Sequence, residues 1–296
     1  MFDYKLIEAL ALVAQQGGFD KAATALHITQ SAVSQRVKLL EEQMGQILLA
    51  RTTPPRTTSA GRKLLKHYLQ VKQLENDLIE ETTAKGDKSF SSLAVALNAD
   101  SLCTWFLSAI QYFATEEGVL FDIRVDDQEQ THRMLKAGEV VGCISTKDQP
   151  LQGCRIDYIG QMNYHMLATP DFVEKWFPTG LNIIDACRAP AIIFNRKDEL
   201  HQKLMQHALG AVPDAIPAHY IPSAEKFADF IAAGLGYGML PTQQSEPFTQ
   251  TGRLVDLAPN YSVPVKLYWH CWNLKSDLLV KLTEHLISKT KTLLAE

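Results

Sequence analysis

Apolar residues near the start of the chain recur at helical spacing in two short, neighbouring segments. The second segment follows Thr29, a good N-cap, and its apolar residues stand at i, i+4, i+7 and i+11, at Val33, Val37, Leu40 and Met44. The first segment carries Ala22, Ala23 and Leu26 on one face, and Ala23 is small enough to let a second helix cross closely. The pattern predicts two packed helices joined by a tight turn.

The opposite face of the second predicted helix is polar and cationic. It carries amides and hydroxyls suited to base edges, and cations suited to bases or phosphate: Gln30, Ser31, Ser34, Gln35, Arg36 and Lys38. This pattern is typical of a DNA-reading helix-turn-helix. An ordinary helical hairpin whose polar residues face water is the alternative at this point.

A short strand-like run at residues 48–50 comes next, and the segment TTPPRTT breaks it with two prolines. A long helix then begins near Thr58, so the pattern indicates a winged helix-turn-helix. Arg51 and Arg56 flank the turn and put cations where a minor groove or a sugar-phosphate strand would lie. Thr58 offers a hydroxyl near a helix start, where unpaired amides attract phosphate oxygens.

The helix expected from about Thr58 to Thr83 is longer than a small domain needs. Leu64, Val71 and Leu78 recur every seven residues along it, which predicts pairing with a second copy of the chain. Two copies would read half-sites about one helical turn apart. A helix packed on its own domain is the alternative. A polar hinge is expected to follow at Lys85 to Lys88.

Beyond residue 90 the pattern changes to alternating strands and helices, the order of a parallel sheet with helical crossovers. A first lobe is expected from the strands SLAVALN, VLFDIRV and VVGCIS with helices over residues 101–114 and 131–137. A second is expected from about residue 161, from the strands YHMLAT, PAIIFN, AHYIPS and YGMLP with helices over residues 200–209 and 225–233. The strand VKLYWHCW and an amphipathic helix over residues 276–295 close the chain.

The charge is unevenly distributed along the chain. Residues 1–72 hold ten Lys and Arg against five Asp and Glu, whereas residues 73–296 hold 19 against 28, so a head of net charge +5 precedes a body of net charge -9. This asymmetry is expected when only one domain touches DNA. At 296 residues and 46% hydrophobic, the chain can bury cores for two or three domains. Without a long apolar run or a leader-like start, we expect a cytoplasmic protein.

Motifs for catalysis and for cofactor binding are missing from the sequence. The five cysteines are widely spaced without a CxxC pair, which argues against a disulfide framework and a zinc cluster. The histidines show no metal-ligand spacing, and GLGYGMLP lacks the GxGxxG spacing of a dinucleotide loop. No GxSxG or P-loop occurs either. We therefore expect no catalytic residues, no metal and no cofactor.

The segment ITQSAVSQRVKLLEEQMG, followed by LLART and TTSAGRKLL, resembles the DNA-binding domain of LysR-type transcriptional regulators. More narrowly, TQSAVSQR, LLARTTPPRTT, NADSLCTW, GEVVGCIS and LYWH resemble the arginine- and lysine-responsive members of that family, which are also described as inhibitors of chromosome initiation. The resemblance implies a homodimer, often a dimer of dimers, that activates a gene for a basic-amino-acid exporter in response to lysine or arginine. Contact with RNA polymerase is then expected.

The fold expected from the pattern and the resemblance is of the α/β class, with an all-α-type N-terminal winged helix-turn-helix and a two-lobed effector domain like that of periplasmic solute-binding proteins. In this family the last strand and helix return to the first lobe. The expected domains are a winged helix-turn-helix over 1–58, a linker and dimerisation helix over 59–84, a hinge over 85–90, and an effector-binding domain over 91–296, with lobe I at 91–160 and 265–296 and lobe II at 161–264.

Ligands of such sheets bind beyond the carboxyl ends of the strands, where loops and helix N-termini converge. The polar residues expected there are Asn98, Asp100, Ser101, Asp126, Asp127, Ser145, Thr146, Thr169, Asn195 and Ser223. Helix starts at Ser101 or Ser223 could hold an α-carboxylate. A dibasic ligand needs a carboxylate, because a buried unpaired charge is costly, and Asp100 is the first candidate before Asp126 or Asp127. For each of these residues an ordinary N-cap is the alternative.

Two classes of function remain open from the sequence. The first is a ligand-responsive DNA-binding regulator, in which ligand closes the lobes and alters the placement of dimers through the hinge, or in which the protein inhibits initiation at a replication origin. The second is a solute-binding or enzymatic α/β protein whose N-terminal helices serve only for association. The basic head favours the first class, because it predicts strongly salt-dependent binding to duplex DNA.

Overall fold

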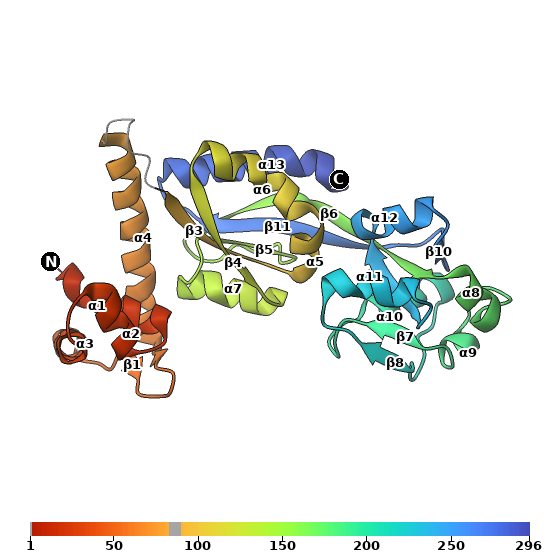
Figure 1. The fold of residues 1–296 in the computed structure, drawn as a ribbon, viewed down its shortest axis with the longest axis horizontal. Helices are drawn as coiled ribbons and strands as arrows, with labels where there is room; N and C mark the ends of the chain where they lie inside the picture. Colours follow the sequence, from red (N-terminus) through yellow and green to blue (C-terminus); the bar gives the residue numbers. More distant parts are fainter. Residues whose placement is uncertain (1, 83–89) are drawn as a thin grey trace.

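A computed structural model describes residues 2–82 and 90–296. Figure 1 shows a helical N-terminal domain with one long helix, an α/β lobe beside that helix, and a second α/β lobe at the far end. The predicted fold class is confirmed. The hinge expected at Lys85 to Lys88 lies outside the described residues, and the domain boundaries proposed from the sequence stay a prediction.

The N-terminal domain consists of α1 (Tyr4–Gln16), α2 (Phe19–Leu26), α3 (Gln30–Met44), β1 (Leu49–Ala50), β2 (Arg56–Thr57) and α4 (Ser59–Thr82). Thr29 caps α3, because its side chain accepts the backbone N–H of Ala32 at 3.2 Å. His27 ends α2 in the left-handed conformation with φ of 54°. Val33, Val37 and Leu40 are buried in the core of this domain, as the spacing predicted, whereas Met44 is half-buried against it.

The predicted wing is a two-stranded antiparallel ladder, in which Leu49 pairs with Thr57 and Ala50 with Arg56. The start of α4 presses against it. A Cβ placed on Gly61 would lie far inside contact distance of the Leu48 carbonyl oxygen. The wing and the long helix are therefore held together by a close backbone approach that only glycine permits.

We expect the substitution Gly61→Ala to lower the free energy of unfolding by about 2 to 3 kcal/mol, because the wing backbone must move to admit the methyl group. Urea-induced unfolding followed by circular dichroism measures the change. Gly18→Ala is the matched control, since nothing lies within 4 Å of a Cβ at that position and its φ of 177° is extended. Equal stabilities of the two variants would contradict the close approach.

The long helix α4 is divided between two environments. Leu64 is buried in the core of its own domain, so it does not belong to a seam with a second copy. Farther along, Leu74, Leu78 and Ile79 are 39%, 59% and 55% exposed. The helix thus packs on its own domain in its first half and presents apolar side chains to the surface in its second half.

Lobe I contains the parallel strands β3 (Ser91–Leu97), β4 (Val119–Val125) and β5 (Gly142–Ser145), with α5 (Ala99–Ser101), the π-helical segment η1 (Leu102–Phe106), α6 (Leu107–Glu116) and α7 (Gln128–Ala137). The helix expected over residues 101–114 therefore starts at Ala99 and contains a π segment. The Thr104 hydroxyl donates to the Asp100 carbonyl oxygen at 2.6 Å and competes for this part of the helical ladder.

Lobe II contains α8 (Pro170–Trp176), α9 (Ile183–Ala186), β7 (Ala191–Ile193), α10 (Leu200–Leu209), β8 (Ala218–Tyr220), α11 (Ala224–Ala232), β9 (Tyr237–Pro241), α12 (Thr242–Gln250) and β10 (Val255–Asp256). Strand β7 lies between β8 and β9 and runs parallel to both. The sequence pattern did not reveal α1, α8, α9, α12 or β10. Except for α1, these elements span only two to nine residues, too few for a periodicity to stand out.

The two lobes share one continuous sheet, in the order β4-β3-β5-β11-β6-β9-β7-β8, with β10 beside β6. Strands β6 (Cys154–Ala168) and β11 (Val263–Trp272) are antiparallel to each other and cross from one lobe to the other (Figure 1). The final helix α13 (Asp277–Leu293) returns to lobe I, where His285 Nε2 lies 2.9 Å from the Ala109 carbonyl oxygen. This return confirms the topology expected of the family.

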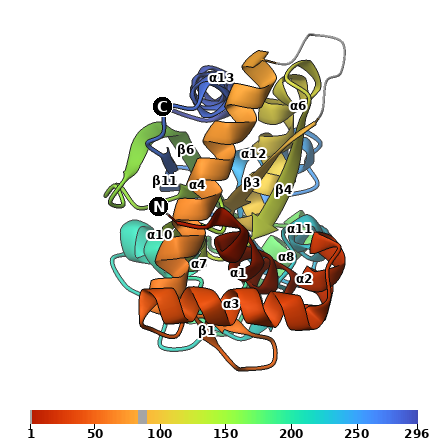
Figure 2. The ribbon, with the colours of Figure 1, turned by 90° about the vertical axis from the view of Figure 1, so that its left-hand side faces the viewer.

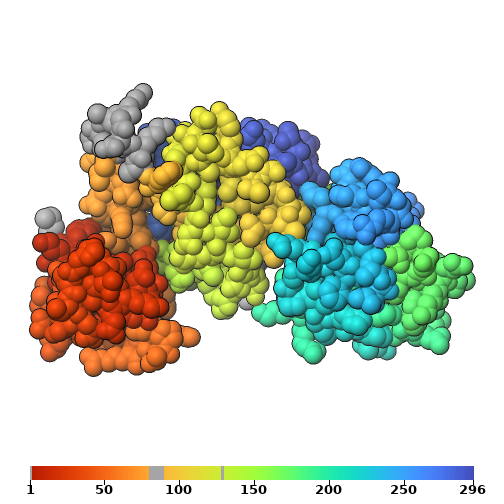
Figure 3. Space-filling view, viewed as in Figure 1, coloured from red at the N-terminus to blue at the C-terminus, as the bar shows by residue number. Residues whose placement is uncertain are grey.

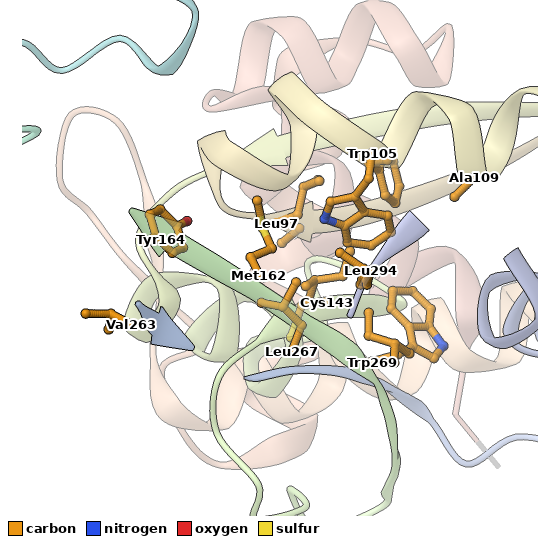
Figure 4. Packing of buried hydrophobic residues seen from close by; sticks show 14 of the residues in the cluster. Leu97, Trp105, Ala109, Cys143, Met162, Tyr164, Val263, Leu267, Trp269 and Leu294 are labelled. Atoms are coloured by element: carbon orange, nitrogen blue, oxygen red, sulfur yellow. The ribbon is translucent and has the colours of Figure 1, made fainter. Parts of the chain in front are cut away.

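The sheet carries the main hydrophobic core of the effector domain. Figure 4 shows Leu97, Trp105, Cys143 and Met162 packed around the crossing strands, with Trp269 nearby. The N-terminal domain has a separate core. Leu69 of α4 packs against both cores, so the long helix is attached to lobe I as well as to its own domain.

Candidate DNA-binding surface and interlobe junction

The polar face of α3 lies on the outside of the N-terminal domain. Gln30, Ser31, Ser34, Gln35 and Lys38 are exposed, and Arg36 is half-buried. Figure 2 shows α3 lying across the front of the domain with the wing loop below it and no other element covering it. Lys38 lies 3.6 Å from Glu42 in an exposed i,i+4 pair, which leaves its ammonium accessible. The geometry admits a duplex against α3, and the contacts of these residues with DNA stay a prediction.

The wing adds cations beside α3. Arg51 and Arg56 are exposed. Arg62, which was not among the residues predicted from the sequence to bind DNA, also lies at the wing, where its Nη1 donates to the Thr57 carbonyl oxygen at 3.0 Å. The expectation that the Thr58 hydroxyl is available to a phosphate needs correction. That hydroxyl donates to the Ile47 carbonyl oxygen at 2.9 Å and accepts the Gly61 N–H at 3.1 Å, so it caps α4.

The interlobe junction is the region where the carboxyl ends of β3, β4 and β5 in lobe I meet those of β7 and β8 in lobe II. The structure brings nine of the ten predicted ligand residues to these strand ends: Asn98, Asp100, Ser101, Asp126, Asp127, Ser145, Thr146, Asn195 and Ser223. An ion pair spans the junction, with the Lys197 ammonium 3.3 Å from Asp127 Oδ2. Figure 3 shows the surface notched between the lobes.

Thr169 lies at the opposite edge of lobe II, which corrects its expected placement. It follows β6, and β6 runs antiparallel to β9, whose direction β7 shares. The carboxyl end of β6 therefore points away from the junction. There the Thr169 hydroxyl caps α8 by accepting the Phe172 N–H at 3.3 Å.

Asp100 is a half-buried residue of the interlobe junction whose carboxylate is largely desolvated. Its Oδ2 accepts the Tyr164 hydroxyl at 2.6 Å, and Tyr164 belongs to the crossing strand β6. Burial raises the pKa of Asp100 above its ordinary value of 3.8, while the Tyr164 hydrogen bond opposes that rise. Within residues 2–82 and 90–296, no lysine or arginine forms an ion pair with Asp100. The structure thus holds a buried carboxylate without a protein cation beside it.

Asp198 is a residue of the junction that the sequence analysis missed. It lies close enough to raise the pKa of Asp100 further. Its two oxygens accept the N–H groups of Phe194 at 3.3 Å and Leu200 at 3.0 Å, which hold the loop after β7. The strand-end rule that selected Asn195 would have selected Asp198 three residues later, had it been extended to the start of α10.

Several other predicted ligand residues have side chains that accept hydrogen bonds from nearby backbone N–H groups and so stabilise local turns. Ser145 accepts the Lys147 N–H at 3.2 Å, Asn195 accepts the Lys197 N–H at 2.8 Å and Ser223 accepts the Lys226 N–H at 3.4 Å. Asp126 likewise accepts the Asp127 N–H at 2.7 Å. For these residues the N-cap or turn alternative describes the observed contacts.

Asn98 and Ser101, on either side of Asp100, differ from that group. The Asn98 Oδ1 and Ser101 Oγ atoms are buried and have no hydrogen-bond partner in the described part of the chain. Unpaired buried polar atoms are costly, so each is a place where a polar ligand group would be stabilised. The segment from Asn98 to Ser101 therefore combines a buried carboxylate with two unsatisfied polar atoms.

Other chemistries find no support in the described ranges. Across residues 2–82 and 90–296, no cluster of three or more His, Cys, Asp or Glu side chains could hold a metal ion. None of the helices described is long and apolar enough to span a membrane.

Comparison with known proteins gives consistent matches over both regions. The model of the bacterial regulatory helix-turn-helix protein, lysR family, matches residues 4–62, and that of the LysR substrate binding domain matches residues 91–287. The chain is 44% identical over 291 residues to the HTH-type transcriptional regulator ArgP of Pseudomonas aeruginosa (strain UCBPP-PA14), covering 98% of this chain and 96% of that relative.

Two solved structures resemble the whole chain. ArgP from Mycobacterium tuberculosis superposes with a TM-score of 0.89 at 36% identity, covering 100% of this chain and 99% of that one. Full-length LysG from Corynebacterium glutamicum with bound effector Arg superposes with a TM-score of 0.80 at 29% identity, covering 100% of both chains. Both resemblances extend through the helix-turn-helix and the effector domain together.

Proposed function

The chain belongs to the lysR family of bacterial helix-turn-helix regulators, and from that membership we propose that its interlobe junction binds arginine or lysine and thereby controls the binding of α3 to operator DNA. It is a DNA-binding transcriptional regulator of the ArgP type. The alternatives of an origin-binding inhibitor of replication and of a solute-binding or enzymatic protein are not favoured. The proposed targets are genes of amino-acid export or metabolism.

The carboxylate of Asp100, which has no ion pair with a lysine or arginine of the described residues, carries the proposal for a basic ligand. A guanidinium or ammonium group placed there would compensate the buried charge and would also reduce its repulsion with Asp198. Such a ligand would receive one carboxylate from each lobe. The arginine bound by LysG of Corynebacterium glutamicum supports the same choice of ligand.

The remaining polar groups suit the amino-acid end of the ligand. Asn98 Oδ1 can accept from an ammonium group, and the Ser101 hydroxyl can donate to a carboxylate; both atoms lack partners within the described residues. We assign these two residues and Asp100 to the first set of ligand contacts. Asp126, Asp127, Ser145, Thr146, Asn195 and Ser223 line the surrounding strand ends as secondary candidates.

The assembly proposed is a homodimer, with a tetramer as the further step. The exposed apolar residues Leu74, Leu78 and Ile79 on the outer half of α4 fit pairing with a second copy. Two reading helices then contact successive half-sites, and RNA polymerase is the proposed protein partner on the promoter. We place the protein in the cytoplasm and assign it no catalytic activity.

The affinities for DNA and for arginine test the proposal together. A duplex carrying the chain's own promoter region is titrated with the full-length protein at low ionic strength, with and without saturating arginine, and arginine is titrated with and without that duplex. The two ratios of dissociation constants must agree, because coupling between two sites is reciprocal. Failure to retain any duplex would refute DNA binding, and failure to bind arginine or lysine would refute the effector assignment.

The affinity for arginine is expected to depend on pH through Asp100. Because burial raises the pKa of Asp100, arginine binding should begin to weaken, as the pH is lowered, at a higher pH than it would with an ordinary aspartate. The affinity for arginine should not change with pH above that pKa and should fall below it. The Tyr164 hydrogen bond lowers the pKa of Asp100, so Tyr164→Phe should move the decline to still higher pH. Calorimetric titration of arginine between about pH 4 and pH 8 measures the shift.

Tyr158→Phe is the control for that experiment, since Tyr158 belongs to the same strand but is 44% exposed. Tyr158→Phe should have the same dependence of arginine affinity on pH as the original chain. A profile that Tyr164→Phe does not move would show that Asp100 is not the titrating group.

A further inference from the structure

We propose that α7 is the rigid link through which the interlobe junction acts on the long helix α4. The inference rests on the proposed function and adds to it the element that carries the ligand's effect toward the DNA-binding domain. Figure 1 shows α7 spanning the lower side of lobe I, with one end toward lobe II and the other toward α4.

The N-terminal end of α7 is tied to lobe II through Asp127. Asp127 Oδ1 accepts the Gln130 N–H at 3.0 Å, and its carbonyl oxygen accepts the Thr131 N–H at 3.0 Å, so this residue caps the helix. The same side chain forms the ion pair with Lys197 across the junction, at 3.3 Å. Lys197 precedes Asp198, the lobe II carboxylate near the proposed ligand site. This pair, whose lysine and aspartate side chains are 78% and 40% exposed, is the contact through which that loop meets the cap of α7.

The C-terminal end of α7 touches the backbone of α4. Gly138 follows the helix with φ of 81°, and a Cβ there would lie 2.6 Å from the Cα of Lys66 and 2.7 Å from its Cβ. The helix is closed at this end, since the N–H groups of Gly138 and Glu139 donate to the carbonyl oxygens of Leu135 and Met134. Because backbone meets backbone at Lys66, no flexible side chain can absorb a movement of α7.

Between its ends α7 is held firmly in lobe I. Leu135 and Thr131 are fully buried, and the ring of His132 lies edge-on against that of His270 with centroids 4.5 Å apart. Ten residues of helix span about 15 Å, enough to connect the junction with α4 in one rigid segment. Lobe I and α7 therefore move as one body, so that a displacement of lobe I relative to lobe II also displaces the contact between Gly138 and α4.

Two cavities beside the contact leave α4 room to move. One of about 600 Å³ is lined by Lys72, Gln73 and Glu139 among others, and one of about 480 Å³ by Arg56, Arg62 and Glu139 among others. Gly138 borders the larger cavity, and Leu69 borders both. The contact of α4 with lobe I at Gly138 is thus bordered by open space, about which α4 can tilt. Because α4 directly follows the wing and the reading helix α3 along the chain, a tilt of α4 changes the spacing of the two reading helices in a dimer.

Gly138→Ala tests the link, and Gly118→Ala is its matched control. Both glycines have positive φ, 81° and 65°, but no atom of the described residues lies within 4 Å of a Cβ at Gly118. The two variants share the conformational penalty and differ in the contact with Lys66. For each full-length protein the duplex dissociation constant is measured with and without saturating arginine, and the arginine dissociation constant is measured without DNA.

We expect Gly138→Ala to move the ratio of the two duplex dissociation constants at least about threefold toward 1, while arginine affinity without DNA stays within about twofold. Gly118→Ala should keep the original ratio. A folded Gly138→Ala protein with the original ratio overturns the link but leaves both binding activities standing. An original chain that binds neither duplex nor arginine overturns the proposed function itself, and the link with it.

Two further measurements keep the link testable if Gly138→Ala does not fold. Hydrogen exchange on the original chain should change on adding arginine at residues 63–72 of α4 as well as at 134–139; a change confined to the junction overturns the link. Lys197→Gln should alter the coupling ratio by about twofold or more, whereas Lys203→Gln, which breaks the similarly exposed pair with Glu199 at the start of α10, should not. Equal coupling ratios for Lys197→Gln and Lys203→Gln would also contradict the proposed link through α7.

Discussion

Asp100→Asn is expected to raise the dissociation constant for arginine about 100-fold while leaving duplex binding without arginine within about twofold. The asparagine has nearly the same shape and can still accept the Tyr164 hydroxyl, which now lies 2.6 Å from the carboxylate. What is lost is the negative charge that a guanidinium or ammonium group would meet. Losing one partner of a buried charged hydrogen bond costs about 2 to 5 kcal/mol, which corresponds to the predicted change.

The stability of the ligand-free protein separates this effect from misfolding. Removing the charge of Asp100 also removes its desolvation cost and its repulsion with Asp198. The melting temperature of Asp100→Asn should therefore equal or exceed that of the original chain. Asp214→Asn is the control, because Asp214 is exposed on a loop of lobe II and should change neither quantity. Unchanged arginine affinity in a folded Asp100→Asn protein would contradict the assignment of this residue.

Local patterns in the sequence predicted the elements that local interactions determine. The residues of α3 were identified from helical spacing and capping alone, because an N-cap such as Thr29 and a stripe such as Val33 to Leu40 act over one to three turns. The wing was predicted from one strand-like run broken by two prolines, and its second strand, β2, was not predicted. The continuous sheet was not predicted, because β6 pairs along its length with β11, which lies about a hundred residues away, beyond the range of a local pattern.

The ligand site shows the same limit. The rule that ligands bind at the carboxyl ends of strands selected Asn98, Asp100 and Ser101, which follow a parallel strand. It misplaced Thr169, because an antiparallel crossing strand reverses the direction of its ends. It also could not find Tyr164, whose hydroxyl reaches Asp100 from 64 residues away on that same strand. The polar contacts that set the charge of the site depend on how the two lobes are joined.

The DNA-binding surface and the ligand site impose opposite electrostatic demands on one chain. The reading surface needs exposed cations, and the wing provides Arg51 and Arg56 at positions open to solvent. The proposed ligand site needs a buried anion, for which Asp100, hydrogen-bonded to Tyr164 of the crossing strand β6, is the candidate. Their separation into a basic head and an acidic body prevents the effector domain from adding nonspecific attraction to DNA.

The double substitution Arg51→Gln with Arg56→Gln is expected to weaken duplex binding about 100- to 1000-fold at about 0.1 M salt, similarly for different sequences. Each proposed dimer loses four cations, and each phosphate contact contributes about 0.9 to the slope of log affinity against log salt, so the slope should fall by up to about 3.6. Ser34→Ala should instead change the preference among bases and keep the slope, since that hydroxyl is exposed on the reading face of α3.

Arg188→Gln with Arg253→Gln supplies the control for the wing variant, because it removes the same charge from exposed positions on lobe II. Its salt slope should equal that of the original chain, which separates direct phosphate contacts from a change in net charge. Titration of one labelled duplex at four or more salt concentrations measures all three slopes. If the wing variant kept the original slope, the wing arginines would not contact phosphate, and the duplex would have to be held by α3 and the start of α4 alone.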